Sequence, residues 1–201
     1  MSEFQYYEFV AIDHPLSLSA QRKLRAITSR ATITANRLVN TYEWGDFKAD
    51  PHTLVTRYFD AFLYSANWGT RHLMLRIPVA KLDAKLALQY CERRQIRSRG
   101  DSSVATVFVN KTHLVFSWWS ENDDAEDQDD VESSALGALT PIRNELMSGD
   151  HRALYLSWLL RRQAGEIRCT DREPACPPDM KRMTGSQVAL AEFLRLDLSG
   201  K

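Results

Sequence analysis

Several short stretches of the chain alternate apolar and polar residues, which is the pattern of half-buried β-strands. In residues 5–13, aromatic and β-branched residues precede a turn-prone Asp-His-Pro sequence. Residues 31–44 alternate toward their end, and an interruption at Ala35-Asn36 divides them into a short strand and a longer one. The pattern predicts strands at residues 5–13, 32–34, 38–44, 72–78, 103–109 and 113–119, the last two joined as a hairpin through residues 110–112.

Between and after these strands, apolar residues recur every three or four positions and predict amphipathic helices. Asp50-Pro51 opens one of them, because Asp can cap a helix and Pro fits its first turn. The apolar stripe of this helix continues to Leu63, and Gly69 then suits a left-handed helix C-cap. The predicted helices span residues 18–28, 50–63, 81–95, 135–147, 150–163 and 186–196, with a proline-rich connector at residues 173–179 before the last.

This order of elements predicts an α+β fold. The first elements run β-α-β-β-α-β, which favours a ferredoxin-like core extended by a helix and a β-hairpin, followed by a C-terminal helical segment. Without the interruption at Ala35-Asn36, the sheet would instead be mixed and partly parallel.

The formal net charge of the 201 residues is zero at pH 7, but the charges are segregated. Residues 1–120 carry +6, residues 121–150 carry −9 and residues 151–201 carry +3. Much of the negative charge lies in the run 121–132 (ENDDAEDQDDVE), which we interpret as a solvated linker or as an electrostatic tail for a basic surface. The predicted organisation is a domain at residues 1–120, an acidic linker at 121–134 and a helical segment at 135–201 that packs on or beside that domain.

Composition favours a globular protein of a reducing compartment. A hydrophobic content of 44% and an aromatic content of 10% suffice for a packed core. No stretch approaches the roughly 20 apolar residues of a membrane span, and the N-terminal segment lacks the basic and apolar regions of a signal peptide. Cys91, Cys169 and Cys176 lack metal-type spacing, so we expect ordinary thiols in a cytoplasmic protein without membrane contact.

No arrangement of residues in the sequence is typical of an active site. The five histidines lack the compact spacing of a zinc site, and the acidic run lacks the glycine of an EF-hand loop. Asp46-x-Lys48, with Asp13 upstream, matches a metal-dependent nuclease only weakly, since such a triplet arises by chance. Cys91 is predicted to be a buried, inert thiol. We therefore expect no catalytic residue, no enzyme activity, no metal and no cofactor.

A dense basic cluster is one candidate for binding. Arg93, Arg94, Arg97 and Arg99 supply the positive charge that phosphate contacts need, which makes nucleic acid a candidate partner. The same residues also fit an ordinary solvated helix end that pairs with the acidic run.

Two tryptophan-glycine pairs are a second candidate. Trp44 and Trp68 each stand where a predicted element ends, and each is followed by a glycine that permits a positive φ. Two interpretations are open. The tryptophans are large plugs at the edges of one core, or they share an aromatic surface for a ligand or partner.

Three segments carry a resemblance: YYEFVAIDHPLS from Tyr6, YEWGDFKADP from Tyr42 and RYFDAFLYSANWGTRHLMLR from Arg57. In this order they resemble a family of uncharacterised bacterial proteins, and the match extends more weakly through residues 142–165. Members of the family are often longer, which implies that this chain is a short form or an N-terminal portion. The resemblance implies no activity and transfers no catalytic or binding residue.

Together these patterns predict a non-enzymatic interaction or regulatory protein that docks to a protein partner in the bacterial cytoplasm. The alternative is a nucleic-acid-associated protein that uses the basic cluster, and an enzyme of unknown class comes third. The sequence leaves the oligomeric state open.

Overall fold

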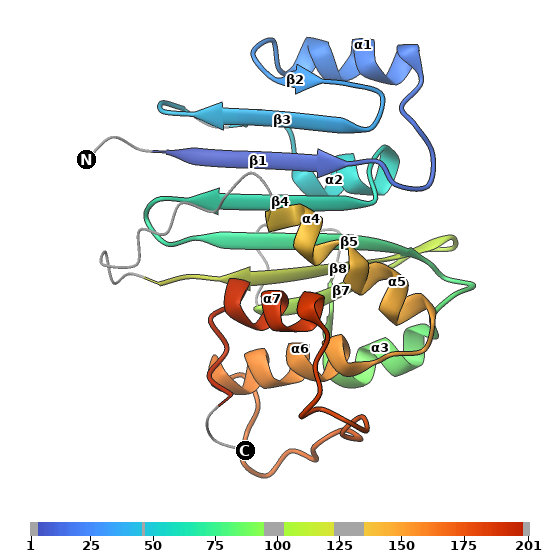
Figure 1. Ribbon diagram of the computed structural model, residues 1–201, viewed down its shortest axis with the longest axis vertical. Coiled ribbons are helices and arrows are strands. Elements are labelled where there is room, and N and C mark those ends of the chain that lie inside the picture. The colour runs from blue at the N-terminus through green and yellow to red at the C-terminus, as the bar shows by residue number, and fades with distance from the viewer. Residues whose placement is uncertain (1–3, 46, 95–102, 123–134, 199–201) are drawn as a thin grey trace. The chain divides into compact units, whose positions relative to one another are not determined.

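The computed structural model describes residues 4–45, 47–94, 103–122 and 135–198. Within these ranges the chain combines helices with eight strands, which agrees with the predicted α+β class (Figure 1). The chain forms two compact units, the first made of residues 1–76 and 120–136 and the second of residues 77–119 and 137–201. This division differs from the predicted one, which placed a single domain at residues 1–120.

The first unit contains an antiparallel sheet with two helices. Its elements are β1 (Gln5–Val10), α1 (Leu18–Ile27), β2 (Thr32–Ile33), β3 (Arg37–Tyr42), α2 (Pro51–Arg57), β4 (Ala61–Ala66) and β5 (Arg71–Pro78), whose last two residues fall in the second unit. The strand order is β2-β3-β1-β4-β5 (Figure 1). Gln5, at the start of β1, lies opposite Tyr42 of β3 on one side and Ala66 of β4 on the other. The ends of β3 and β4 therefore lie on either side of the start of β1.

Aromatic side chains on one face of this sheet form the core of the first unit. The ring centroid of Phe9 lies 4.5 Å from that of Phe62 and 5.1 Å from that of Phe59. Tyr7, two residues earlier on the same strand face, stacks on Phe47 at 5.2 Å. Such pairs contribute about 0.5–1.5 kcal/mol each beyond the burial of their area. They fix β1 at the centre of the unit.

Two predictions for this part of the chain are wrong. The helix predicted at residues 50–63 ends at Arg57, and the following residues form β4. Every residue of β4 is buried, so the polar alternation that marks a half-buried strand is missing. Gly69 consequently lies in the turn between β4 and β5, with a φ of +94°, and not at a helix C-cap. The strand predicted at residues 72–78 is present as β5, but its partner in the first unit is β4.

A buried ion pair fixes the junction between α2 and β4. The Asp60 carboxylate, whose side chain is 1% exposed, accepts hydrogen bonds from the backbone N–H groups of Ile12 and Asp13 at 2.7 and 3.0 Å. The Arg76 guanidinium donates two more, at 2.8 and 3.1 Å. Burial alone would raise the pKa of Asp60, but these donors outweigh burial and hold the pKa below its usual value.

The second unit combines a small sheet with several helices. Its elements are α3 (Ala84–Tyr90), β6 (Glu92–Arg93), β7 (Ala105–Val109), β8 (His113–Ser120, whose last residue falls in the first unit), α5 (Pro141–Met147), α6 (Arg152–Gln163) and α7 (Gly185–Phe193), and α4 (Ala135–Leu139) leads into it. β7 pairs antiparallel with β8 and parallel with β6. Helix α6 packs on β7, α3 and α7. Inside this core the indole N–H of Trp118 donates to the Ser157 hydroxyl of α6 at 2.7 Å.

The predicted elements of the second unit are present with different boundaries. The hairpin through residues 110–112 is confirmed, and the Asn110 side chain closes its turn by accepting hydrogen bonds from two backbone N–H groups. The third predicted helix is shorter, because Asp83 caps α3 at its start and the chain enters β6 soon after its end. The fourth predicted helix is divided into α4 and α5, with Pro141 in the first turn of α5.

Candidate functional site

Trp44 and Trp68 lie in turns at the same end of the sheet of the first unit. Trp44 follows β3, Trp68 lies in the β4–β5 turn, and both strands flank the start of β1 (Figure 1). Because neighbouring strands are about 4.8 Å apart, the ends of β3 and β4 that lead into these turns are separated by roughly 10 Å. Trp44 is 75% exposed and Trp68 is 45% exposed. The interpretation of both tryptophans as plugs of the core is therefore wrong.

The segment that opens β1 holds both turns in place. The side-chain amide of Gln5 donates to the Gly45 carbonyl at 3.0 Å. On the other side, the Phe4 N–H donates to Oδ1 of Asn67 at 3.0 Å, and the Asn67 N–H donates to the Phe4 carbonyl at 3.0 Å. Phe4 is itself exposed. We name the three exposed side chains at this end the aromatic patch: Phe4, Trp44 and Trp68.

Two exposed carboxylates accompany the aromatic patch. Gly69 has a positive φ, and a Cβ at this position would overlap the backbone carbonyl of Asn122. The segment that follows β8 therefore lies against the β4–β5 turn at Asn122. The residue before Asn122 is Glu121, which is exposed. Glu43, also exposed, directly follows β3. Both carboxylates belong to the first unit.

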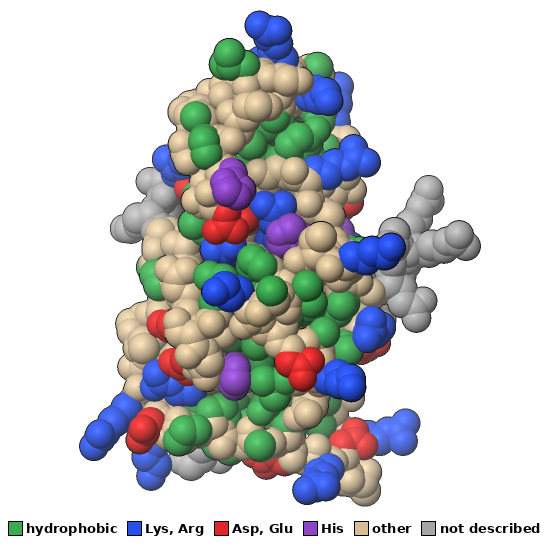
Figure 2. Space-filling model, turned by 90° about the vertical axis from the view of Figure 1, so that its right-hand side faces the viewer, with side chains coloured by type: hydrophobic (Ala, Val, Ile, Leu, Met, Phe, Trp, Pro, Cys, Tyr) green, Lys and Arg blue, Asp and Glu red, His purple; other side chains and the backbone are tan. Residues whose placement is uncertain are grey.

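The structure describes only half of the basic cluster. Arg93 is exposed in β6, and Arg94 is half-buried, with its backbone N–H donating to the Val107 carbonyl at 3.0 Å. Arg97 and Arg99 lie outside the described residues. On the face drawn in Figure 2, Lys and Arg side chains lie among Asp and Glu side chains.

The remaining sequence candidates are the Asp46-x-Lys48 triplet and the acidic segment. Asp46 and residues 123–134 of the acidic segment lie outside the described residues. Within the ranges that are described, no group of three or more His, Cys, Asp or Glu side chains could hold a metal ion. In those same ranges, every helix is too short or too polar to cross a membrane.

Cys91 is buried at the end of α3, as predicted. Burial raises the pKa of its thiol to about 12, although a hydrogen bond from Ser157 and the charge of Arg161 act in the opposite direction. The cause of the raised pKa is therefore the loss of hydration on burial. A thiol with this pKa is not a nucleophile near neutral pH.

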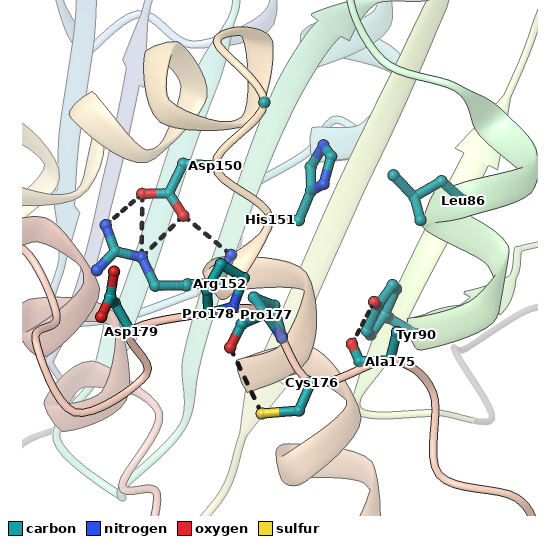
Figure 3. A pocket seen from close by; sticks show the side chains of 11 residues that line it. Leu86, Tyr90, Asp150, His151, Arg152, Ala175, Cys176, Pro177, Pro178 and Asp179 are labelled. Carbon is teal, nitrogen blue, oxygen red and sulfur yellow. Dashed lines mark hydrogen bonds and ion pairs between the residues drawn. The ribbon is translucent and has the colours of Figure 1, made fainter.

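The second unit contains a cavity of about 460 Å³, which no sequence pattern indicated. Figure 3 shows it between α3, the turn that precedes α6 and residues 175–179 of the proline-rich connector. The Arg152 guanidinium donates to both carboxylate oxygens of Asp150 at 2.5–3.1 Å and to the Arg182 carbonyl at 2.5 Å. These contacts with Arg152 lower the pKa of Asp150 to about 2. The charge of Arg152 is thus already compensated, and the cavity offers little to an anionic ligand.

No protein-family model matches the chain, and searches of curated proteins and of solved structures found no match. Sequence patterns identified both tryptophans but missed Phe4 and the two carboxylates. These three residues lie near the tryptophan turns because of the register of β1 and because the chain after β8 passes close to Gly69 at Asn122. Neither feature can be predicted from the neighbouring residues in the sequence.

Proposed function

We propose that this chain is a non-enzymatic interaction protein of the bacterial cytoplasm that docks to a protein partner through the aromatic patch. The observation that carries the proposal is the exposure of Trp44 and Trp68 on turns that the start of β1 holds in place. Tryptophan is enriched at the energetic centres of interfaces, and neighbouring exposed apolar side chains mark interaction sites. Turns that are already fixed lose little conformational entropy when a partner binds.

The exposed area of the two tryptophans determines how much binding free energy they can contribute to docking. A tryptophan contributes up to about 250 Å² of surface, so exposed fractions of 75% and 45% leave on the order of 300 Å² accessible. Covering that area contributes about 7.5 kcal/mol at 25 cal/mol per Å². Association costs about 4–15 kcal/mol in translational and rotational freedom. The tryptophans can therefore anchor a partner only if contacts around them add to the binding energy.

We also infer that the first four strands form a ferredoxin-like arrangement, with β4 in the place that we expected β5 to take. The antiparallel order β2-β3-β1-β4, with connections through α1 and α2, supports this inference. In that arrangement β3 and β4 both end beside the start of β1, which accounts for the proximity of the two tryptophan turns. Membership of the bacterial family that the sequence resembles stays a proposal and supplies no activity.

Affinity capture with substituted full-length chains tests the docking proposal. The immobilised wild-type chain is incubated with a lysate of the native host, bound proteins are identified by mass spectrometry, and the affinity of the purified partner is then measured. We expect Trp44→Ala and Trp68→Ala each to weaken binding by tenfold or more, because interface tryptophans often contribute about 2 kcal/mol. Leu18→Ala is the matched control, since Leu18 is 72% exposed and opens α1 after the opposite end of β1. A partner that binds the tryptophan variants as tightly as the wild type would rule out the patch as its docking site.

A nucleic-acid-associated role is the second candidate, favoured by the exposure of Arg93. The same capture, repeated across a salt series, separates the two roles. Recovery of nucleic acid with steep salt dependence, lost on Arg93→Gln together with Arg97→Gln, would favour the basic cluster over the aromatic patch.

A further inference from the structure

We propose that the partner segment that covers the aromatic patch is basic, with Lys or Arg side chains seated on the indole rings beside Glu43 and Glu121. This inference rests on the docking function proposed above and specifies the chemistry of its partner. The candidate site consists of these two carboxylates and the three aromatic side chains of the patch.

The charges at this end of the first unit favour a cationic occupant. Glu43 and Glu121 are exposed, and neither forms an ion pair with any residue that the structure describes. Arg71, at the start of β5, is half-buried and already interacts within the chain. Glu121 also opens a stretch, residues 121–132, in which eight of twelve residues are acidic. The resulting negative potential attracts cations and accelerates their encounter with the patch.

Exposed indole rings add a specific attraction for the same kind of side chain. Among aromatic rings, the face of tryptophan binds a guanidinium or ammonium group most strongly, and the attraction increases when water is excluded. The chain contains such a pair in its second unit, where the guanidinium carbon of Arg162 lies 5.7 Å from the ring centroid of Trp158. A basic segment would thus gain from the rings and from the carboxylates together.

The same charges disfavour single-stranded nucleic acid on this surface. Bases stack well on tryptophan, but the phosphates that accompany them need positive charge beside the rings. Glu43 and Glu121 supply negative charge instead. Among macromolecules that could use the two indoles, a Lys- or Arg-bearing peptide segment is therefore the one that the surface fits.

Titration of the full-length chain with defined peptides tests the inference. The probe is a synthetic peptide of alternating Arg and Gly, and the matched peptides carry Glu or Ser in place of Arg. Binding is measured by calorimetry and by the NMR shifts of the tryptophan indole N–H groups. We expect the Arg peptide to bind and the other two not to bind. We expect Trp44→Ala and Trp68→Ala each to weaken binding of the Arg peptide about tenfold. The double substitution Glu43→Gln and Glu121→Gln should weaken this binding severalfold and reduce its salt dependence. Leu18→Ala should leave it unchanged.

Three outcomes would overturn the inference. The first is binding of the Arg peptide that is insensitive to both tryptophan substitutions, because the acidic run alone would then explain it. The second is equal binding of the Ser peptide. The third is a dimer in sedimentation velocity that dissociates on Trp44→Ala, since the occupant would then be a second copy of this chain. If the lysate partner requires the tryptophans but the Arg peptide does not displace it, the docking function stands and only the basic occupant is wrong.

Discussion

The Asp60→Asn substitution keeps the shape of the side chain but removes the charge that anchors the far end of β1. In the wild type, one carboxylate oxygen accepts the two backbone N–H groups of Ile12 and Asp13, and the other accepts two N–H groups of Arg76. An asparagine has only one acceptor oxygen, so its NH2 group must face a pair of donors. Two of the four hydrogen bonds are therefore lost, and Arg76 stays buried without its counter-ion.

The structure sets the size of the expected loss. The Arg76 and Asp60 side chains are 13% and 1% exposed, so water compensates little for the missing charge. Removing one partner of a buried ion pair costs about 3–5 kcal/mol, and two hydrogen bonds to a charged group contribute about 1.5–3 kcal/mol each. Because Arg76 keeps a hydrogen bond to the Thr56 carbonyl at 3.1 Å, we expect a loss near the lower end, about 3 kcal/mol.

The loss should depend on pH in one direction. Folding lowers the pKa of Asp60, so the ionised carboxylate stabilises the first unit. This stabilisation is fully present above the unfolded-state pKa of about 3.9. It disappears as the pH falls through the lower pKa of the folded state. The difference between wild type and Asp60→Asn should therefore be complete at pH 7 and shrink below about pH 4. Urea unfolding followed by circular dichroism at several pH values measures this difference.

The exposed Glu92–Arg161 pair is the control. Its atoms lie 3.5 Å apart, the Glu92 side chain is 46% exposed, and Arg161 keeps its ion pair with Glu166 at 3.0 Å, so Glu92→Gln should cost less than about 1 kcal/mol. If Asp60→Asn costs no more than Glu92→Gln, or if its cost is the same at pH 7 and pH 3, the assignment of a buried, charge-dependent anchor at Asp60 is refuted.

Three further predictions concern a turn, the proline-rich connector and a thiol. Gly69→Ala should lower the free energy of unfolding by more than about 2 kcal/mol, since the added Cβ meets a backbone carbonyl. Gly45 has a φ of +80° but open space around it, so Gly45→Ala should cost about 1 kcal/mol. Urea unfolding measures both losses. Tyr155→Phe removes the hydrogen bond to Glu173 and should cost about 1 kcal/mol while accelerating proteolysis within the connector. Iodoacetamide should label the two exposed cysteines of the native protein and spare Cys91, as peptide mass spectrometry can show, because burial raises the pKa of Cys91 to about 12.

Sequence patterns predicted the elements whose two faces differ in polarity. The hairpin of β7 and β8 has a clear turn signal at Asn110, and a recognisable Asp-His-Pro sequence follows β1 three residues after its end at Val10. β4 was missed because all six of its residues are buried, so it has no polar face to reveal a period of two. An apolar run of this kind fits the apolar face of a longer α2 as well as it fits a strand. Only the pairing of these residues with β1 and β5 shows that they form a strand.

The candidate site was only partly predictable for a related reason. Composition and spacing identify Trp44 and Trp68 as unusual, but a large apolar side chain is buried more often than not, so exposure has no sequence signal. The association of Glu121 with Trp68 arises between residues far apart in the chain. It follows from the close approach of the backbone at Gly69, which is visible only in the folded chain.

The aromatic patch and the buried ion pair occupy opposite ends of the same strand. β1 spans six residues, or about 20 Å at 3.3 Å per residue. At its start, Phe4 and Gln5 hold the two tryptophan turns, and at its far end Asp60 binds the backbone just beyond β1. Between these ends, six residues of β1 pair on both sides with β3 and β4, so that a slip of one residue would turn the aromatic core outward. The register that buries Phe9 is therefore also the register that brings the tryptophan turns together. The turns can separate only if β1 changes its register, and this change would also expose the aromatic core of the first unit.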